Sequence, residues 1–347
     1  MPKPSDNPQW IRKVGVMLFT SKNQNFTGPF GEPDPNHPII TLSDFRIQFQ
    51  IQNAEQETPD NAHIRIYNLN PETTEKIIRG YSTAKNAITR GEFTDIAINA
   101  GYENGNYGVI FSGSIRQYKT GKEDAVTRYL DIYASSMEYI YNSIINTNVP
   151  KDNTLEQNLQ HILTDNTDPA VNSTAVNLSG LQMDALHIIQ PRGSVFFGMT
   201  RYFLRRYANT LQATWWLKDG QLVLINKTGY VENDIVELNY TTGLIGVPEQ
   251  TDQGVKIKCL LNSNIQIGCL VHINNELITQ TLSPSSAQSP QAYNKLTGLY
   301  FNALLNPDGK YRCMVVEHEG DTRGKEWYTT IIGLYMDSST NTTIEGA

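Results

Sequence analysis

The chain has 347 residues, of which 39 % are apolar and 18 % are charged, and its formal net charge is −7. A single hydrophobic core stops growing near about 250–300 residues, so we expect more than one domain. The acidic balance argues against a general nucleic-acid binder, although it leaves open a protein that surrounds nucleic acid without adhering to it.

The cysteines and the apolar segments give no sign of a metal, a disulfide framework or a membrane anchor. Cys259, Cys269 and Cys313 are odd in number and lack CxxC spacing, so we expect small buried thiols in a reducing compartment. The first ten residues contain no apolar signal-peptide core, and no run of about 18 apolar residues predicts a membrane span. We therefore expect no cofactor and no metal.

Residues 1–148 are predicted to form a first antiparallel β-barrel. Ile47, Phe49 and Ile51 alternate with polar residues, which is the pattern of a strand with one buried face. Asn70 and Pro71 predict the start of a short helix that ends near Arg79. The predicted strands are Val14–Thr20, Asp44–Gln52, Ala62–Leu69, Phe93–Tyr102, Gly108–Lys119 and Val126–Ser135.

Residues 149–233 are predicted to form a small α+β domain. Apolar residues at helical spacing predict helices over Asn153–Asp165 and Gly193–Asn209. The strands Gln212–Leu217 and Gln221–Asn226 flank an Asp-Gly turn and predict a hairpin. In that hairpin Trp215 and Trp216 alternate, so one ring should face the core and the other should face outward or into an interface.

Residues 234–347 are predicted to form a second β-barrel. Its predicted strands are Val255–Leu261, Cys269–Asn275, Tyr311–Glu317 and Lys325–Leu334. A long loop, 276–308, is expected to be structureless, and such a loop in a compact domain is usually functional or ordered by a partner. Its aromatic residues Tyr293, Tyr300 and Phe301 have no assigned core.

The predicted hairpin between Tyr311 and Ile332 carries the most conspicuous set of charged residues. Glu317, Glu319 and Asp321 lie at alternate positions, so they should share one face of a strand. A metal site or a general acid–base pair is one interpretation. We favour an acidic row that faces solvent or a neighbouring subunit, with Arg323 and Lys325 nearby. His318 should lie on the opposite face as a hydrogen-bonded structural residue.

A basic and aromatic cluster lies in the second predicted helix, at Arg201, Tyr202, Arg205, Arg206 and Tyr207. It permits a nucleic-acid-binding interpretation. The favoured interpretation is an amphipathic helix with a basic polar face. No GxSxG motif, zinc motif or Cys/His pair indicates a hydrolase.

Several segments together resemble the baseplate hub proteins of tailed bacteriophages. These are AHIRIYNLNPET at Ala62–Thr73, the strand pair AGY at Ala100–Tyr102 and IFSGSI at Ile110–Ile115, the hairpin EHEGDTRGKEW at Glu317–Trp327, and the segment Gly254–Asn262. Each is turn and strand chemistry, and the resemblance rests on their order and spacing over most of the chain.

The resemblance implies two β-barrels that flank the α+β domain, and a structural virion protein without a catalytic step. Three copies would form a ring that adapts a six-fold tail tube to a three-fold central spike and surrounds the DNA exit channel. The implied partners are the other copies, the tail tube or tube-initiator protein, the spike, the tape-measure protein and the baseplate wedge. The implied location is the tail baseplate, assembled in the host cytoplasm.

Two surfaces are expected to carry the contacts between subunits. One is the hairpin, with Glu317, Glu319, Asp321, Arg323 and Trp327, and the other is the long loop, with Tyr293, Tyr300 and Phe301. Two alternatives stay open. The chain could be a hub-associated hydrolase that degrades the cell wall, or a β-barrel module that binds carbohydrate or nucleic acid. Affinity as an isolated monomer would favour the binding module.

Overall fold

The computed structural model describes the greater part of the chain. The described residues are 11–19, 40–56, 58–78, 95–136, 138–164, 175–177, 187–218, 221–231, 235–251, 254–274, 279–280, 291–294, 299–302 and 309–335. Among these residues, no helix is long and apolar enough to cross a membrane.

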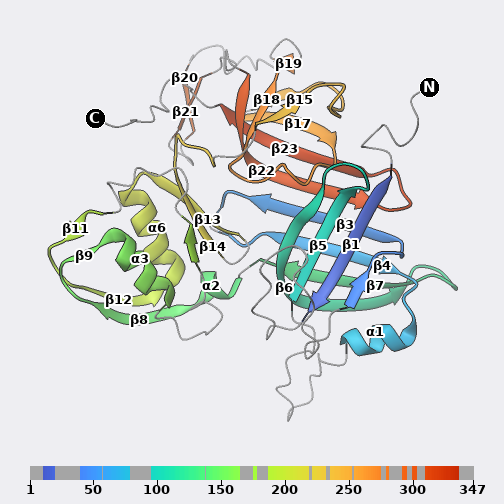
Figure 1. Ribbon diagram of the computed structural model, residues 1–347, viewed down its shortest axis with the longest axis horizontal. Coiled ribbons are helices and arrows are strands. Elements are labelled where there is room, and N and C mark those ends of the chain that lie inside the picture. Colours follow the sequence, from blue (N-terminus) through green and yellow to red (C-terminus); the bar gives the residue numbers. More distant parts are fainter. Residues whose placement is uncertain are drawn as a thin grey trace.

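Most strands belong to one 14-stranded sheet, whose main path runs β19-β16-β17-β23-β22-β3-β4-β7-β6-β5-β1-β2 (Figure 1). Strand β18 pairs with β22, and β15 pairs with β18. Pairing is antiparallel except for β15–β18 and β16–β19. The strands are β1 (Arg12–Phe19), β2 (Ile40–Leu42), β3 (Ile47–Ala54), β4 (Asn61–Tyr67), β5 (Asp95–Tyr102), β6 (Tyr107–Lys122), β7 (Arg128–Ser135), β15 (Val236–Leu238), β16 (Glu249–Thr251), β17 (Gly254–Leu260), β18 (Leu270–Ile273), β19 (Thr279–Gln280), β22 (Lys310–Asp321) and β23 (Trp327–Tyr335).

The N-terminal half of the sheet folds over its own core. Strand β6 pairs with β5 up to Ser114 and with β7 from Ser114 onward, so it turns the corner between two layers. Gly113 lies at this corner, where an added Cβ would stand 2.7 Å from the carbonyl oxygen of Ser135. Strands β1 and β5 therefore lie across β3, β4 and β7 (Figure 1), with Ile47, Phe49 and Ile51 buried between the layers as predicted.

The prediction of a mainly β, antiparallel fold is confirmed. The described strands do not form the two closed barrels that were also predicted. They pair as one open sheet, because β22 pairs with β3 and joins the N-terminal strands to the C-terminal strands. One backbone edge of β22 pairs with β23 and the other pairs with β3, so β22 connects the two halves and closes neither of them into a barrel. The domain boundaries at 148/149 and 233/234 stay predictions.

The predicted short helix is confirmed as α1 (Pro71–Ile78). The side-chain oxygen of Asn70 accepts a hydrogen bond from the backbone N–H of Glu72 at 3.1 Å, as an N-cap residue does.

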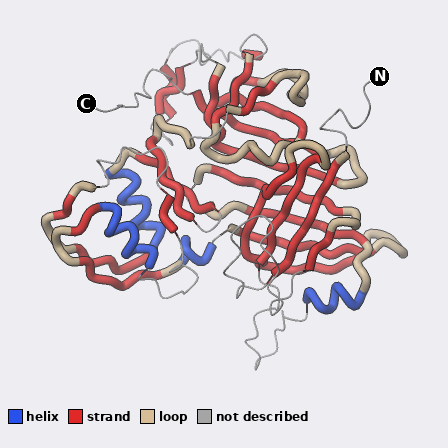
Figure 2. The backbone as a smooth tube through the Cα atoms, in the orientation of Figure 1, coloured by secondary structure: helices blue, strands red, loops and turns tan. Residues whose placement is uncertain are grey.

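The middle of the chain packs short strands around two helices (Figure 2). Helix α3 begins with Thr154 and Gln157 in a capping box, in which each side chain accepts a hydrogen bond from the other residue's backbone N–H. The elements are α2 (Glu138–Asn142), β8 (Ile144–Val149), β9 (Asn153–Thr154), α3 (Leu155–Thr164), β10 (Ala175–Asn177), β11 (Ile189–Gln190), β12 (Ser194–Met199), α6 (Thr200–Thr210), β13 (Ala213–Lys218) and β14 (Gln221–Asn226).

The prediction of one helix over Gly193–Asn209 was wrong in its first half, which is strand β12. This strand pairs antiparallel with β8, a strand that the sequence interpretation missed. Phe196 packs edge-on against Phe203 of α6, with ring centroids 5.1 Å apart. In the strand Phe196 and Phe197 point to opposite faces, so Phe196 is buried and Phe197 is exposed.

The β13–β14 hairpin is confirmed, with Lys218 paired to Gln221, and its Asp-Gly turn lies outside the described residues. Both tryptophans are buried. Trp215 packs in the core of the middle region, whereas Trp216 packs with Ile267 of the C-terminal half. The second ring therefore faces an interface within the chain.

The prediction that 276–308 is structureless was wrong in part. Strand β19 pairs with β16, and β20 (Gln291–Asn294) forms an antiparallel pair with β21 (Leu299–Asn302), with Tyr293 and Tyr300 as register partners. The side chains of Tyr293, Tyr300 and Phe301 lie outside the described part of the structure.

A buried arginine joins three parts of the chain. One terminal nitrogen of Arg312, on β22, donates to Glu55 after β3 at 3.0 Å. The other donates to the carbonyl oxygens of Asn226, Lys227 and Gly229, at 3.4, 3.2 and 2.7 Å. The side chains of Arg312 and Glu55 are only 1 % and 3 % exposed. The N-terminal half (β1 to β7), the middle region (α2 to β14 and the loop after it) and the C-terminal half (β15 to β23) therefore meet at one guanidinium.

Replacing Arg312 by Met should destabilise the protein by about 3–5 kcal/mol, because it leaves the Glu55 carboxylate buried without its cation. Urea denaturation measures the loss. Adding Glu55→Gln should recover part of it, and Lys256→Met, at an exposed position of β17, is the control. A loss below about 1 kcal/mol would place this pair with ordinary surface pairs.

Candidate functional site

The outward side of the sheet forms one polar surface across both halves of the chain. The register aligns Lys119, Asp131, Arg65, Gln48 and Asp321 in a row across β6, β7, β4, β3 and β22. A parallel row contains Gln117, Tyr133, His63, Gln50, Glu319 and Tyr328, and a third contains Gln52, Glu317, Thr330 and Lys258. We call this surface the polar face. It arises because each strand alternates buried apolar residues with polar ones.

The first charge pair on the polar face joins β4 to β7. Arg65 donates two hydrogen bonds to the carboxylate of Asp131, at 2.6 and 2.9 Å, and its guanidinium lies 4.2 Å from the ring centroid of Tyr129. Burial alone would raise the pKa of Asp131, but the bonds from Arg65 and the nearby His63 lower it. His63 in turn stacks on Tyr133, with ring centroids 4.5 Å apart.

The second charge pair joins β22 to the segment before β3. Arg46 donates to Asp321 at 2.8 Å, and Gln48 and the backbone N–H of Arg323 donate to the same carboxylate at 2.8 and 2.9 Å. Burial would raise the pKa of Asp321, but these donors hold it at about 2. Asp321 is therefore the anchor of the hairpin turn, and it is ionised at any physiological pH.

The predicted acidic row is thus divided. Glu317 accepts a hydrogen bond from Gln52 at 3.0 Å, and Glu319 is exposed opposite Gln50. Asp321 is buried at the end of the row.

Two other residues of the predicted contact hairpin lie in different environments. Arg323 is exposed in the turn. Trp327 is fully buried and packs edge-on against Phe49 of the N-terminal core, at 5.5 Å between ring centroids. Because β22 pairs with β3 on one side and β23 on the other, only exposed side chains of this hairpin can meet a neighbour.

His318 lies on the other side of β22, as expected, and is hydrogen-bonded. Its Nδ1 lies 3.0 Å from the hydroxyl oxygen of Thr329. Burial lowers the pKa of His318 to about 4, so the ring is neutral at pH 7.

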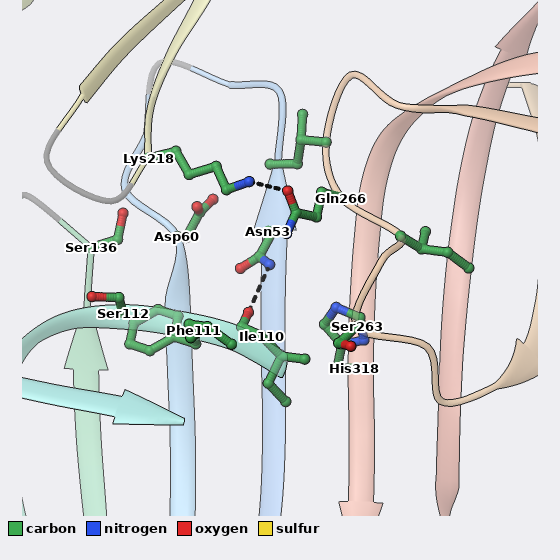
Figure 3. A pocket seen from close by; sticks show the side chains of 13 residues that line it. Asn53, Asp60, Ile110, Phe111, Ser112, Ser136, Lys218, Ser263, Gln266 and His318 are labelled. Atoms are coloured by element: carbon green, nitrogen blue, oxygen red, sulfur yellow. Dashed lines mark hydrogen bonds between the residues drawn. The ribbon is translucent and has the colours of Figure 1, made fainter. Parts of the chain in front are cut away.

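His318 also lines a small polar cavity where the three parts of the chain meet (Figure 3). Asn53 and Asp60 belong to the N-terminal half, Lys218 to the middle region and Gln266 to the C-terminal half. Lys218 donates a hydrogen bond to Gln266. The cavity volume is about 40 Å³, which is room for a few water molecules. The arrangement is a packed joint and not a substrate pocket.

A larger hollow of about 610 Å³ opens on the polar face itself. Gln50, His63, Tyr133 and Glu317 line it from the sheet, and Arg201 of α6 lines it from the middle region. In the described part of the chain, no three His, Cys, Asp or Glu side chains gather as metal ligands would.

The basic and aromatic cluster lies on an amphipathic helix, as favoured. Phe203, Leu204 and Ala208 of α6 are buried, whereas Tyr202 and Arg206 are exposed. The three cysteines are buried free thiols, and burial raises the pKa of Cys259 to about 12.

Sequence reasoning missed Arg46, Arg65 and Arg312, which hold the buried carboxylates. A signal was present for Arg312, because it is the single charge in the otherwise apolar run Tyr311–Val316. A charge at a buried strand position needs a partner. Its partner Glu55 is far away in sequence, so only the fold identifies it.

Replacing Asp321 by Asn should remove a stabilising contribution that depends on pH. The folded pKa of about 2 lies below the ordinary 3.8, so the contribution is complete above about pH 4 and is lost as the pH falls towards 2. Between pH 5 and pH 2 the wild type should lose about 2 kcal/mol more stability than the variant. Denaturation at each pH measures this, with Glu319→Gln as the exposed control. Parallel pH profiles for wild type and Asp321→Asn would refute the assignment.

Replacing His318 by Gln should alter the pH dependence of stability in a different pH range. The folded pKa of about 4 lies below the ordinary 6.5, so the unfolded chain takes up the proton first and stability falls between pH 6.5 and pH 4. The wild type should lose about 3 kcal/mol there, and the variant should not show this loss. The exposed His187, replaced by Gln, is the control. If His318→Gln keeps the full loss, another group is responsible.

Comparisons with known proteins agree with this architecture. A family model described as baseplate hub gp41 matches residues 33–280. The matched range contains the segments at Ala62–Thr73, Ala100–Tyr102 and Gly254–Asn262 and ends before the β22–β23 hairpin. A search of curated proteins finds no significant match.

Solved structures of tail proteins have a similar fold. The tail protein from Neisseria meningitidis MC58 has a TM-score of 0.52 and 11 % identity, over 93 % of this chain and 96 % of that chain. The 43 kDa tail protein of prophage MuSo2 from Shewanella oneidensis has a TM-score of 0.52 and 8 % identity over the same shares. At such identities the likeness establishes the fold alone, whereas the family model matches well over half of the sequence. The chain therefore belongs to the baseplate hub gp41 family, a family of structural proteins of the phage tail.

Proposed function

We propose that three copies of this chain form a ring that adapts a six-fold tail tube to a three-fold central spike and surrounds the channel through which DNA leaves. The protein acts by assembly and without a chemical step. Its partners are the tail tube or tube-initiator protein, the spike, the tape-measure protein and the baseplate wedge. It is a component of the virion baseplate and is assembled in the host cytoplasm.

The observation that carries this proposal is the sheet shared through β22. Each half of the chain has its own hydrophobic core, and the β22–β3 pairing fixes the two halves side by side. Three copies with two such halves each supply six β-sheet units around an axis. A ring of three subunits with six similar units can meet a six-fold neighbour on one side and a three-fold neighbour on the other. Its closed rotational symmetry repeats the same contact between successive subunits.

The polar face supports a channel that a charged polymer passes without adhering. Non-specific DNA affinity comes from cations that are free to pair with phosphates. On this face Arg65 is held by Asp131, and beside it Arg46 is held by Asp321. Lys258 lies over the ring of Tyr328, and Lys119 is exposed. Many of the remaining residues of the three rows are neutral amides, hydroxyls and aromatic rings. The net charge of −7 acts in the same direction.

For the contacts between subunits we propose the exposed Glu319 and Arg323 and the half-buried Glu317 of the hairpin, together with the segment that contains Tyr293, Tyr300 and Phe301. Asp321 and Trp327 contribute from inside, because they hold the hairpin in place.

The mass of the purified protein by light scattering, alone and with the candidate spike protein, tests the ring. We expect a trimer, or a monomer that the spike drives into a complex with three copies. Arg323→Glu should weaken the assembly, whereas Lys256→Glu, at an exposed position of β17, is the matched control. A stable monomer that does not respond to the spike protein would overturn the proposal.

A further inference from the structure

Strand β12 carries an apolar row that faces away from the core. Val195, Phe197 and Met199 are 69 %, 74 % and 45 % exposed, and Ile144 of β8, which pairs with Met199, is 56 % exposed. We call these four residues the β12 stripe. The opposite side of the same ribbon is already filled, because Phe196 and its neighbours pack against α3 and α6.

A two-stranded ribbon with one buried face normally places polar residues on the other face. Strand β8 follows that rule after Ile144, since Asn146 and Asn148 face outward opposite Phe197 and Val195. Strand β12 breaks it at three successive outward positions. Large exposed apolar side chains that adjoin one another on a sheet mark a surface that another protein covers.

The surroundings of the β12 stripe are mostly basic. At one end of the ribbon, Lys151 follows β8 and Arg192 precedes β12. At the other end, Arg201 lies two residues after Met199. Among the described residues that directly flank the two strands in sequence, Asp152 is the carboxylate, and it lies 3.7 Å from the ammonium of Lys151. A partner for this surface should therefore offer an apolar side chain flanked by carboxylates.

The turn between β6 and β7 has this composition. Beyond the last strand pair, Lys122 with Arg128, the turn reads Glu-Asp-Ala-Val-Thr and contains two carboxylates and no cation. Its Val126 is 86 % exposed, the most exposed large apolar residue of the described chain.

The shape of this turn is fixed by internal hydrogen bonds. The carboxylate of Asp124 accepts bonds from the backbone N–H groups of Val126 and Thr127, at 2.8 and 2.6 Å, and from the hydroxyl of Thr127 at 2.9 Å. Val126 is thus presented in one orientation, and the neighbouring Glu123 is exposed. A preordered turn loses little conformational entropy when it binds.

The turn and the β12 stripe lie at opposite ends of the molecule. In Figure 1 the β6–β7 hairpin projects at the right, whereas β8 and β12 form the lower left margin. One chain cannot bring these two features together, but two copies can. A contact between two different surfaces of identical subunits repeats head to tail and closes into a ring when the rotation allows it.

We propose that the β6–β7 turn of one subunit docks on the β12 stripe of the next, with Val126 against Phe197 and Glu123 towards the basic rim. This inference rests on the proposed ring and names one contact that builds it.

Disulfide trapping with two variants of the full chain tests the contact. Val126→Cys and Phe197→Cys are mixed in equal amounts and oxidised, and covalent dimers are counted on a non-reducing gel. The native cysteines are buried, so the engineered thiols react alone. We expect dimers in the mixture and at least about tenfold fewer when Tyr240→Cys, at a site of 61 % exposure in the C-terminal half, replaces Phe197→Cys.

Light scattering on single variants separates this contact from the ring itself. Phe197→Ser should reduce self-association at least about tenfold with an unchanged melting temperature, and Tyr240→Ser should not. If the wild type associates but Phe197→Ser associates equally well and no specific dimer is trapped, the ring stands and this contact is wrong. If the wild type stays a monomer at every concentration, alone and with the spike protein, and no dimer is trapped, both proposals are wrong.

Discussion

Strand β22 is the constraint on which the rest of this structure depends. It is hydrogen-bonded to β23 along nearly its whole length, and its other edge is divided between β18 and β3. The two β halves therefore cannot move apart without breaking a continuous ladder in the middle of a sheet. A charge pair at each end fixes the register: Arg312 with Glu55, both buried, and the buried Asp321 with the more exposed Arg46. An unpaired buried charge is costly.

This constraint connects stability to assembly. In the proposed ring a subunit would transmit load between a tube on one side and a spike on the other, and a rigid joint between its two halves suits that task. The joint also includes the middle region, because Arg312 binds carbonyl oxygens there and Trp216 packs with Ile267. The middle region in turn presents the β12 stripe, so the orientation of that surface is set by the same buried contacts.

Local pattern predicted much of the secondary structure, for physical reasons visible in single segments. The alternation in β3, the N-cap at Asn70 and the Lys218–Gln221 hairpin depend on neighbours in sequence, and all three are confirmed. The errors occurred where one pattern satisfies two geometries. Val195 to Met199 is apolar enough for a helix, and pairing with β8 decided that it is a strand. The strands of the two expected barrels were predicted largely correctly, as was the β22–β23 hairpin, but the pairing of β22 with β3 was not.

The sequence by itself determined that the chain is mainly β and acidic and that its polar residues lie on one side of each strand. Family resemblance could be seen in its turns, because turn chemistry is local. Only the tertiary structure decided that β22 pairs with β3, that Asp321 and Trp327 are buried, and which arginine holds which carboxylate. These facts depend on contacts between residues hundreds of positions apart, such as Glu55 with Arg312. Alternation tells which face of a strand is polar, but it carries no information about which strand lies beside it.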